Sequence, residues 1–171
     1  MNIILVGYMG CGKSTLGKQL AKRYNLQFID TDLLIETETQ LKIPEIFIRF
    51  GENYFRELER KTIEKLAKSD NLLISTGGGL PIYNNLMDEL NKIGLTIYLK
   101  RPAKELANRV FNSKKKRPLT DGKSYDELVY FIESGLAKRE PIYEQAQLIV
   151  DRTIKNISSL ELTINTFLNQ Q

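Results

Sequence analysis

The stretch from Gly7 to Ser14 reads Gly-Tyr-Met-Gly-Cys-Gly-Lys-Ser and fits the phosphate-loop pattern G-x-x-x-x-G-K-[ST]. Its glycines allow consecutive backbone N–H groups to turn toward an anion, and the helix expected to follow adds partial positive charge. Lys13 can reach the β- and γ-phosphates of a nucleotide, and the Ser14 hydroxyl is placed to ligate Mg²⁺. The alternative is a plain glycine-rich turn between a strand and a helix.

Composition limits the other chemistry that is available. The 171 residues include no histidine and one cysteine, which excludes a Ser-His-Asp relay, a His-ligated zinc, a cysteine-built metal cluster and an internal disulfide. A reducing compartment fits this cysteine usage. Cys11 itself lies inside the phosphate loop, either as a small filler residue or as a reactive thiol. The net charge of +4 favours anionic partners without distinguishing a nucleotide from a nucleic acid.

Two carboxylates follow the second apolar run, in the sequence Asp30-Thr31-Asp32. Residues two apart at a strand end point the same way, so both carboxylates can face one site. Beside a phosphate loop, such a pair suits a water-bridged Mg²⁺, a substrate hydroxyl, or both. The alternative is that one of them caps the following helix, and the two roles are compatible for different members of the pair.

A second glycine loop, Ser75-Thr76-Gly77-Gly78-Gly79, closes the third apolar run. Three successive glycines indicate a place where no side chain is tolerated, so backbone N–H groups are expected to contact a ligand. A flexible turn is the alternative. Over half of the 11 glycines lie in these two loops.

Arg139 is singled out by helical geometry. On a helix expected from Ser124 to Tyr143, it lies in the middle of an apolar stripe formed by Leu128, Phe131, Ile132, Gly135 and Leu136. An inward arginine needs an anion as its partner, which is either a ligand carboxylate or phosphate or a carboxylate of the core.

Two other basic features allow a structural and a functional interpretation. Arg56, with Glu59 three residues later, is by itself most simply an ordinary surface ion pair. The run Lys114 to Arg117 is a solvated basic loop, a nucleic-acid patch or a lid that carries an arginine onto a phosphate. Neither aromatic interleaving nor a recognition motif supports the nucleic-acid interpretation.

The elements that must position these residues alternate along the chain. Apolar runs predict five buried strands, at 3–6, 27–29, 72–74, 95–99 and 148–150. Amphipathic helices are expected between them, and the last would carry Ile157, Leu160, Ile164, Phe167 and Leu168 on one face. This alternation predicts an α/β domain around a parallel sheet of about five strands. Both glycine loops then fall at the carboxyl edge of the sheet, where such sheets bind ligands.

Taken together, these motifs resemble the shikimate kinase family of phosphate-loop enzymes over nearly the whole chain, from Ile3 to about Asp151. The resemblance also uses Gly51-Glu52, Phe55-Arg56 with Glu59, and Arg117-Pro118-Leu119. It implies one kinase domain over 1–171, a three-layer α/β/α sandwich whose central five-stranded parallel sheet has the order 2-3-1-4-5. A substrate-binding region at about 33–66 and a mobile lid at about 111–123 would complete it.

The resemblance also implies a role for each matching residue. Contacts to ATP would come from Gly10, Cys11, Gly12, Lys13, Ser14, Thr15, Arg109, Arg117 and Arg152. Contacts to shikimate would come from Asp32, Phe47, Phe55, Arg56, Gly78, Gly79 and Arg139. Catalysis would depend on Lys13, on Asp32 as the candidate base and on Arg117. Mg²⁺ would be bound by Ser14 and, through water, by Asp30.

We therefore expect a cytoplasmic, monomeric enzyme that uses ATP and Mg²⁺ to phosphorylate the 3-hydroxyl of shikimate. No membrane partner is expected, because no apolar stretch approaches about 20 residues. No nucleic-acid partner is expected, because neither aromatic interleaving nor a recognition motif accompanies the basic run. No signal peptide is expected, because the first strand begins next to Met1. The alternatives are a kinase specific for gluconate or a nucleoside monophosphate, and a nucleic-acid-binding or regulatory nucleotide switch.

Overall fold

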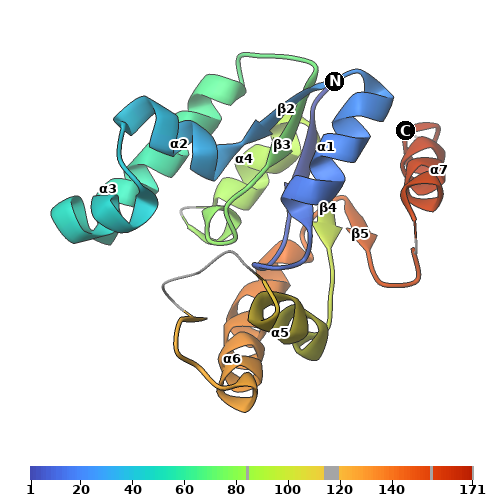
Figure 1. The fold of residues 1–171 in the computed structure, drawn as a ribbon. Coiled ribbons are helices and arrows are strands. Elements are labelled where there is room, and N and C mark those ends of the chain that lie inside the picture. The colour runs from blue at the N-terminus through green and yellow to red at the C-terminus, as the bar shows by residue number, and fades with distance from the viewer. Residues whose placement is uncertain (84, 114–119, 155, 171) are drawn as a thin grey trace.

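The computed structural model describes residues 1–83, 85–113, 120–154 and 156–170 (Figure 1). Five strands form one parallel sheet with the order β2-β3-β1-β4-β5, as expected. They are β1 (Ile3–Val6), β2 (Gln27–Asp30), β3 (Leu72–Ser75), β4 (Leu95–Leu99) and β5 (Leu148–Val150). The chain passes from β1 to the outer strand β2, returns to β3 beside β1, and then continues to β4 and β5 on the other side. Because the strands are parallel, the carboxyl ends of β1, β3 and β2 lie at the same edge of the sheet.

Within the described residues, seven α-helices and one short 3₁₀ turn surround this sheet. They are α1 (Lys13–Tyr24), α2 (Thr31–Thr39), α3 (Ile43–Leu66), the turn η1 (Leu80–Ile82), α4 (Leu86–Ile93), α5 (Ala103–Phe111), α6 (Tyr125–Tyr143) and α7 (Ile157–Leu168). Figure 1 shows α1 and α7 on one side of the sheet, and α3 and α4 on the other. This is the expected three-layer arrangement. None of the helices in the described part of the chain is long and apolar enough to cross a membrane.

The prediction of five buried strands is right for the three inner strands and wrong for the two outer ones. Every residue of β1, β3 and β4 is buried. In β2, Gln27 is exposed and the rest is half-buried, while Ile149 of β5 is exposed. The reason is their place in the sheet, because an edge strand has a neighbour on one side only.

Helix α3 contains a sharp bend at Gly51. This residue has φ +80° and ψ 175°, whereas the residues on either side are helical. Because that conformation is costly for a residue with a Cβ, glycine suits the position. The bend separates the start of α3, which carries Phe47, from the part that carries Arg56. In Figure 1, α2 and the start of α3 extend away from the sheet, and both belong to the predicted substrate-binding region.

Candidate active site

The phosphate loop occupies the turn between β1 and α1. Gly10 and Gly12 have φ values of +82° and +100°, which supports the glycine requirement inferred from the sequence. The Lys13 ammonium donates hydrogen bonds to the carbonyl oxygens of Gly7, at 2.7 Å, and Tyr8, at 3.1 Å. The cation is therefore held across its own loop, close to the positive end of α1.

Cys11 lies beneath this loop and is buried. Its Sγ lies 3.7 Å from Lys13 Nζ, and a Cβ built on Gly7 would approach that sulfur to 3.1 Å. The thiol thus occupies the space that the loop encloses. This burial supports the interpretation of Cys11 as a filler residue.

The residues predicted to hold a metal ion are brought together at the end of β2. The Ser14 hydroxyl donates to Asp30 Oδ2 at 2.8 Å, and Ser75 Oγ lies 3.5 Å from the same oxygen. Hydroxyl and carboxylate oxygens are the hard donors that Mg²⁺ prefers, so this set fits that ion. Sequence reasoning assigned no role to Ser75. The signal that finds it is strand register, because Ser75 pairs with Asp30 across β2 and β3.

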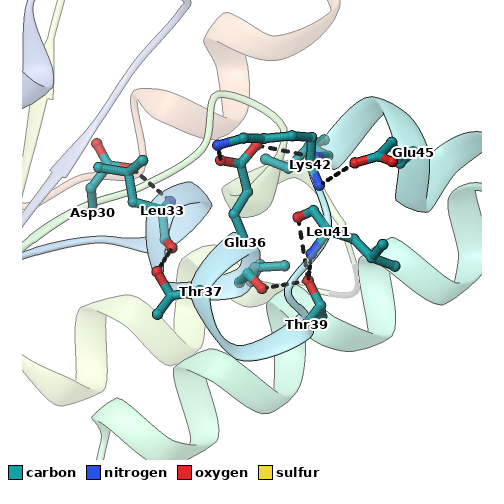
Figure 2. Close-up of polar contacts among 10 residues, drawn as sticks. Asp30, Leu33, Glu36, Thr37, Thr39, Leu41, Lys42 and Glu45 are labelled. Atoms are coloured by element: carbon teal, nitrogen blue, oxygen red, sulfur yellow. Dashed lines mark hydrogen bonds and ion pairs between the residues drawn. The ribbon is translucent and has the colours of Figure 1, made fainter.

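Asp30 also caps α2, so the capping alternative is confirmed for this aspartate; its role in binding Mg²⁺ through water stays a prediction. Its Oδ1 accepts a hydrogen bond from the Leu33 backbone N–H at 3.4 Å. Figure 2 shows this cap and the polar contacts that join α2 to α3. Glu36 accepts from Lys42 Nζ at 2.8 Å and from the Ile43 N–H at 3.1 Å. These contacts fix the position at which α3 begins.

The three glycines after β3 each meet a different close neighbour. A Cβ on Gly77 would lie 2.5 Å from Asp32 Oδ1, and a Cβ on Gly79 would lie 2.8 Å from Arg56 Nη1. On Gly78 it would lie 3.5 Å from the Gly7 carbonyl oxygen. Side chains at Gly77 and Gly79 would therefore displace functional groups of α2 and α3, whereas the distance at Gly78 is an ordinary van der Waals contact.

Glu59 is the buried carboxylate of this region, with 1 % of its side chain exposed. Burial raises its pKa to about 7, although the Arg56 hydrogen bond and charge act in the opposite direction. The Asp32 carboxylate contributes to the rise. The carboxyl group of Glu59 therefore titrates near neutral pH, with the half-buried Asp32 as a second carboxylate nearby.

Arg56 binds two carboxylates of its own helix. Its Nη1 donates to Glu59 Oε2 at 2.7 Å, while Nε and Nη2 donate to Glu52 Oε1 at 3.2 and 2.9 Å. The Arg56 side chain is only 14 % exposed. The interpretation of Arg56 and Glu59 as an ordinary surface pair is therefore wrong, because the segment after β3 covers the face of α3 that carries them.

Arg139 points inward from α6, as its place in the apolar stripe predicted. Its Cζ lies 5.2 Å from the ring centroid of Tyr8, and its charge acts on the Tyr143 hydroxyl. That hydroxyl donates to the Gly78 carbonyl at 2.5 Å. Among the described residues, Arg139 forms no ion pair within 4.0 Å, so the interpretation as a core ion pair finds no support there. Its surroundings link α6 to both glycine loops.

Burial raises the pKa of the Tyr8 and Tyr143 hydroxyls, while the charge of Arg139 lowers it to a smaller extent. Both phenols are consequently neutral hydrogen-bonding groups at physiological pH. Gly135 provides the room for one of them, since a Cβ there would lie 2.2 Å from the Tyr8 hydroxyl oxygen. Sequence reasoning missed this pairing, because it assigned Gly135 only to the apolar stripe.

Phe47 and Phe55, the predicted apolar wall, come from opposite sides of the Gly51 bend. Their ring centroids are 4.8 Å apart. With Ile35 and Ile46 they form a small hydrophobic cluster separate from the main core. The bend in α3 therefore brings the two aromatic rings together.

The residues predicted to contact the nucleotide outside the loop lie in different places. Arg109 on α5 sits over the phosphate loop, with Nη1 3.5 Å from a Cβ built on Gly12 and Nη2 2.7 Å from Glu105. Thr15 is exposed in the first turn of α1, and Arg152 is exposed in the turn after β5. Arg117 lies outside the described residues, as does the central part, 114–119, of the predicted lid.

Comparison with known proteins identifies a family. The shikimate kinase family model matches residues 9–168. A shikimate kinase from Clostridium botulinum is 49 % identical over 153 residues, which cover 89 % of this chain and 88 % of the relative.

Solved structures agree with that match. The crystal structure of shikimate kinase from Bacteroides thetaiotaomicron is 40 % identical, with a TM-score of 0.91, and the alignment covers 99 % of this chain and 98 % of that one. Shikimate kinase from Acinetobacter baumannii, in complex with shikimate, is 31 % identical, with a TM-score of 0.83 and coverage of 99 % and 93 %.

Proposed function

This chain belongs to the shikimate kinase family, and we propose on that premise that it transfers the γ-phosphoryl group of ATP to the 3-hydroxyl of shikimate. The products are ADP and shikimate 3-phosphate, an intermediate on the route to chorismate and the aromatic amino acids. One observation carries the proposal most directly. A phosphate loop and a glycine loop on adjacent strands lie beside two inward arginines and a pair of carboxylates.

On the donor side, the phosphate loop binds the ATP phosphates. The backbone of the loop surrounds the β-phosphate, and the Lys13 ammonium leaves its loop carbonyls for the phosphate oxygens. Mg²⁺ fits the Ser14 hydroxyl and, through water, the Asp30 carboxylate; when bound, it would neutralise charge on the β- and γ-phosphates. The remaining residues assigned to ATP are Gly10, Cys11, Gly12, Thr15, Arg109 and Arg152.

On the acceptor side, Arg56 and Arg139 bind the carboxylate of shikimate. A planar guanidinium matches a carboxylate through two parallel hydrogen bonds. Gly78 and Gly79 bring their backbone to the substrate, and Phe47 and Phe55 cover its apolar face. Asp32 binds the ring hydroxyls. The packing of Asp32 and Arg56 against the glycine loop supports this assignment.

The chemical step is an in-line substitution at phosphorus. The bond between the γ-phosphorus and the oxygen that bridges it to the β-phosphate breaks, and a bond forms between phosphorus and the shikimate 3-oxygen. The hydroxyl proton passes late in the step to the Asp32 carboxylate, which also aligns the nucleophile. Lys13 neutralises the charge that develops on the phosphates. The resemblance to the family assigns the same role to Arg117, which belongs to the predicted lid.

A panel of acceptors tests the proposed function. ADP release is measured with MgATP and either shikimate, gluconate or a series of nucleoside monophosphates, and nucleic-acid binding is measured in parallel at varied salt. We expect ADP release that saturates with shikimate alone, and no salt-dependent nucleic-acid binding. Saturable turnover of gluconate or a monophosphate without shikimate turnover would contradict the proposal.

A further inference from the structure

Tyr83, which has no role in the proposed site, contacts the guanidinium of Arg56. The Arg56 Cζ lies 3.9 Å from the centroid of the Tyr83 ring. The corresponding distance from Arg139 to Tyr8 is 5.2 Å. A separation of 3.9 Å places the guanidinium directly against the ring, where its attraction to the aromatic face is strong. Tyr83 directly follows η1, so it comes from a different segment than Arg56 does.

The Tyr83 hydroxyl reaches the same carboxylate that Arg56 uses. It donates to Glu52 Oε1 at 2.5 Å, and that oxygen also accepts from Arg56 Nε and Nη2. Glu52 is half exposed, so it needs partners to keep one conformation. The hydrogen bond from Tyr83, followed by that from Arg56, lowers the pKa of Glu52, so this carboxyl is ionised at neutral pH.

Defined groups thus hold the Arg56 guanidinium on several sides. Glu59 accepts a hydrogen bond from Nη1, and Glu52 accepts from Nε and Nη2. The Tyr83 ring covers one face of the guanidinium. A Cβ on Gly79 would lie 2.8 Å from Nη1, so a side chain there would crowd this group. Glu59 is buried, so it is a fixed partner, whereas Glu52 depends on Tyr83 and on Arg56 itself.

We propose that Tyr83 is a positioning residue for Arg56: its ring fixes the plane of the guanidinium, and its hydroxyl fixes Glu52 against the outer edge. The inference rests on the proposed function of Arg56, which is to bind the carboxylate of the substrate. Two parallel hydrogen bonds to a carboxylate form only when the guanidinium plane is correctly oriented. A guanidinium that is oriented before the substrate arrives loses less entropy on binding.

Steady-state kinetics of three variants test the ring and the hydroxyl separately. Tyr83→Leu removes both, Tyr83→Phe removes only the hydroxyl, and Tyr130→Leu is the matched control because Tyr130 is 73 % exposed on α6. We expect the shikimate KM to rise about tenfold in Tyr83→Leu and about twofold in Tyr83→Phe. The kcat and the ATP KM stay within about twofold, and Tyr130→Leu matches the wild type. A shikimate KM that is unchanged in Tyr83→Leu, or a fall in kcat alone, overturns the inference.

A double-mutant cycle tests whether the hydroxyl acts through Glu52. We expect Tyr83→Phe to add nothing to the KM of Glu52→Gln, because the group on which the hydroxyl acts has already changed. Tyr83→Leu still raises the KM in that background, because the ring contacts Arg56 directly. Additive effects of Tyr83→Phe and Glu52→Gln contradict the path through Glu52.

A measurement without substrate separates this inference from the proposed function. Nitrogen-15 relaxation of the Arg56 Nε–H group in the unliganded protein reports the order of that side chain. We expect clear loss of order in Tyr83→Leu and wild-type order in Tyr130→Leu. If the wild type does not turn over shikimate, the proposed function fails, and the relaxation result still decides whether Tyr83 positions Arg56. Equal order in wild type and Tyr83→Leu overturns the positioning role.

Discussion

The donor and acceptor sides of this site are built in different ways. The phosphate loop is one continuous segment, and Lys13 is held by backbone carbonyls of that same segment. The acceptor side takes Asp32 from α2, Arg56 from α3 and Arg139 from α6. The three helices come together at the glycine loop after β3, where Asp32 lies beside Gly77, Arg56 beside Gly79 and Tyr143 of α6 bonds Gly78.

This difference predicts that the two halves of the reaction can be damaged separately. A backbone-built loop binds phosphates largely through N–H groups, which side-chain substitutions elsewhere leave in place. The acceptor side depends on side-chain contacts between elements, so its variants should change shikimate binding while ATP binding persists. Single substitutions on each side either separate the two functions or show that the two sides act as one unit.

The largest effect is expected from Lys13→Met on the donor side. The substitution removes the charge that meets the phosphates, so we expect kcat/KM for ATP to fall about 10³-fold. The exposed lysine Lys22 on the same helix provides the control Lys22→Met, which should match the wild type. A fall of less than about tenfold would show that the backbone of the phosphate loop is enough to bind the ATP phosphates without Lys13.

Asp32→Asn should stop turnover and leave the donor side intact. Because the amide cannot accept the hydroxyl proton, we expect kcat to fall about 10²-fold or more, with the Kd for ATP unchanged within about twofold. Single-turnover kinetics and nucleotide titration measure the two quantities. Weaker nucleotide binding in this variant would contradict the separation of the two sides.

Arg139→Lys should affect substrate binding more than the chemical step. A lysine keeps the charge but cannot form two parallel hydrogen bonds, so we expect the shikimate KM to rise about tenfold and the ATP KM to stay unchanged. Kinetics at saturating ATP measure the change. An unchanged shikimate KM would remove Arg139 from the acceptor side.

Glu59 should give the acceptor side a pH-dependent stability. Its pKa is raised from 4.5 to about 7 in the folded protein, so the folded state binds this proton more tightly than the unfolded state does. The stability from this group is present below about pH 4.5 and is lost as the pH rises through about 7. Relative to Glu59→Gln, we expect the wild type to lose about 1–3 kcal/mol of unfolding free energy between those values. If the unfolding free energies of the two proteins, measured by urea titration, change equally with pH across this range, the assignment is refuted.

Sequence alone could locate the phosphate loop because its pattern is contiguous. The positions of all five strands and the inward direction of Arg139 follow from local periodicity, and the structure agrees with both. The family resemblance supplied the sheet order, which is confirmed.

The remaining features depend on contacts between elements distant in sequence. Examples are the burial of Glu59, the register that pairs Ser75 with Asp30, and the Tyr8 hydroxyl that faces Gly135. Each needs the packing of a particular helix or strand against another. Local patterns carry no such information, which is why Arg56 and Glu59 resembled a surface pair.

The identity of the phosphorylated product tests the central claim most directly. The purified enzyme is incubated with MgATP and shikimate, and the products are analysed by phosphorus-31 NMR and mass spectrometry. We predict one phosphoryl group on the 3-oxygen of shikimate for every ADP formed. ADP release without phosphorylated shikimate, or a phosphoryl group on another hydroxyl, would contradict the assigned reaction.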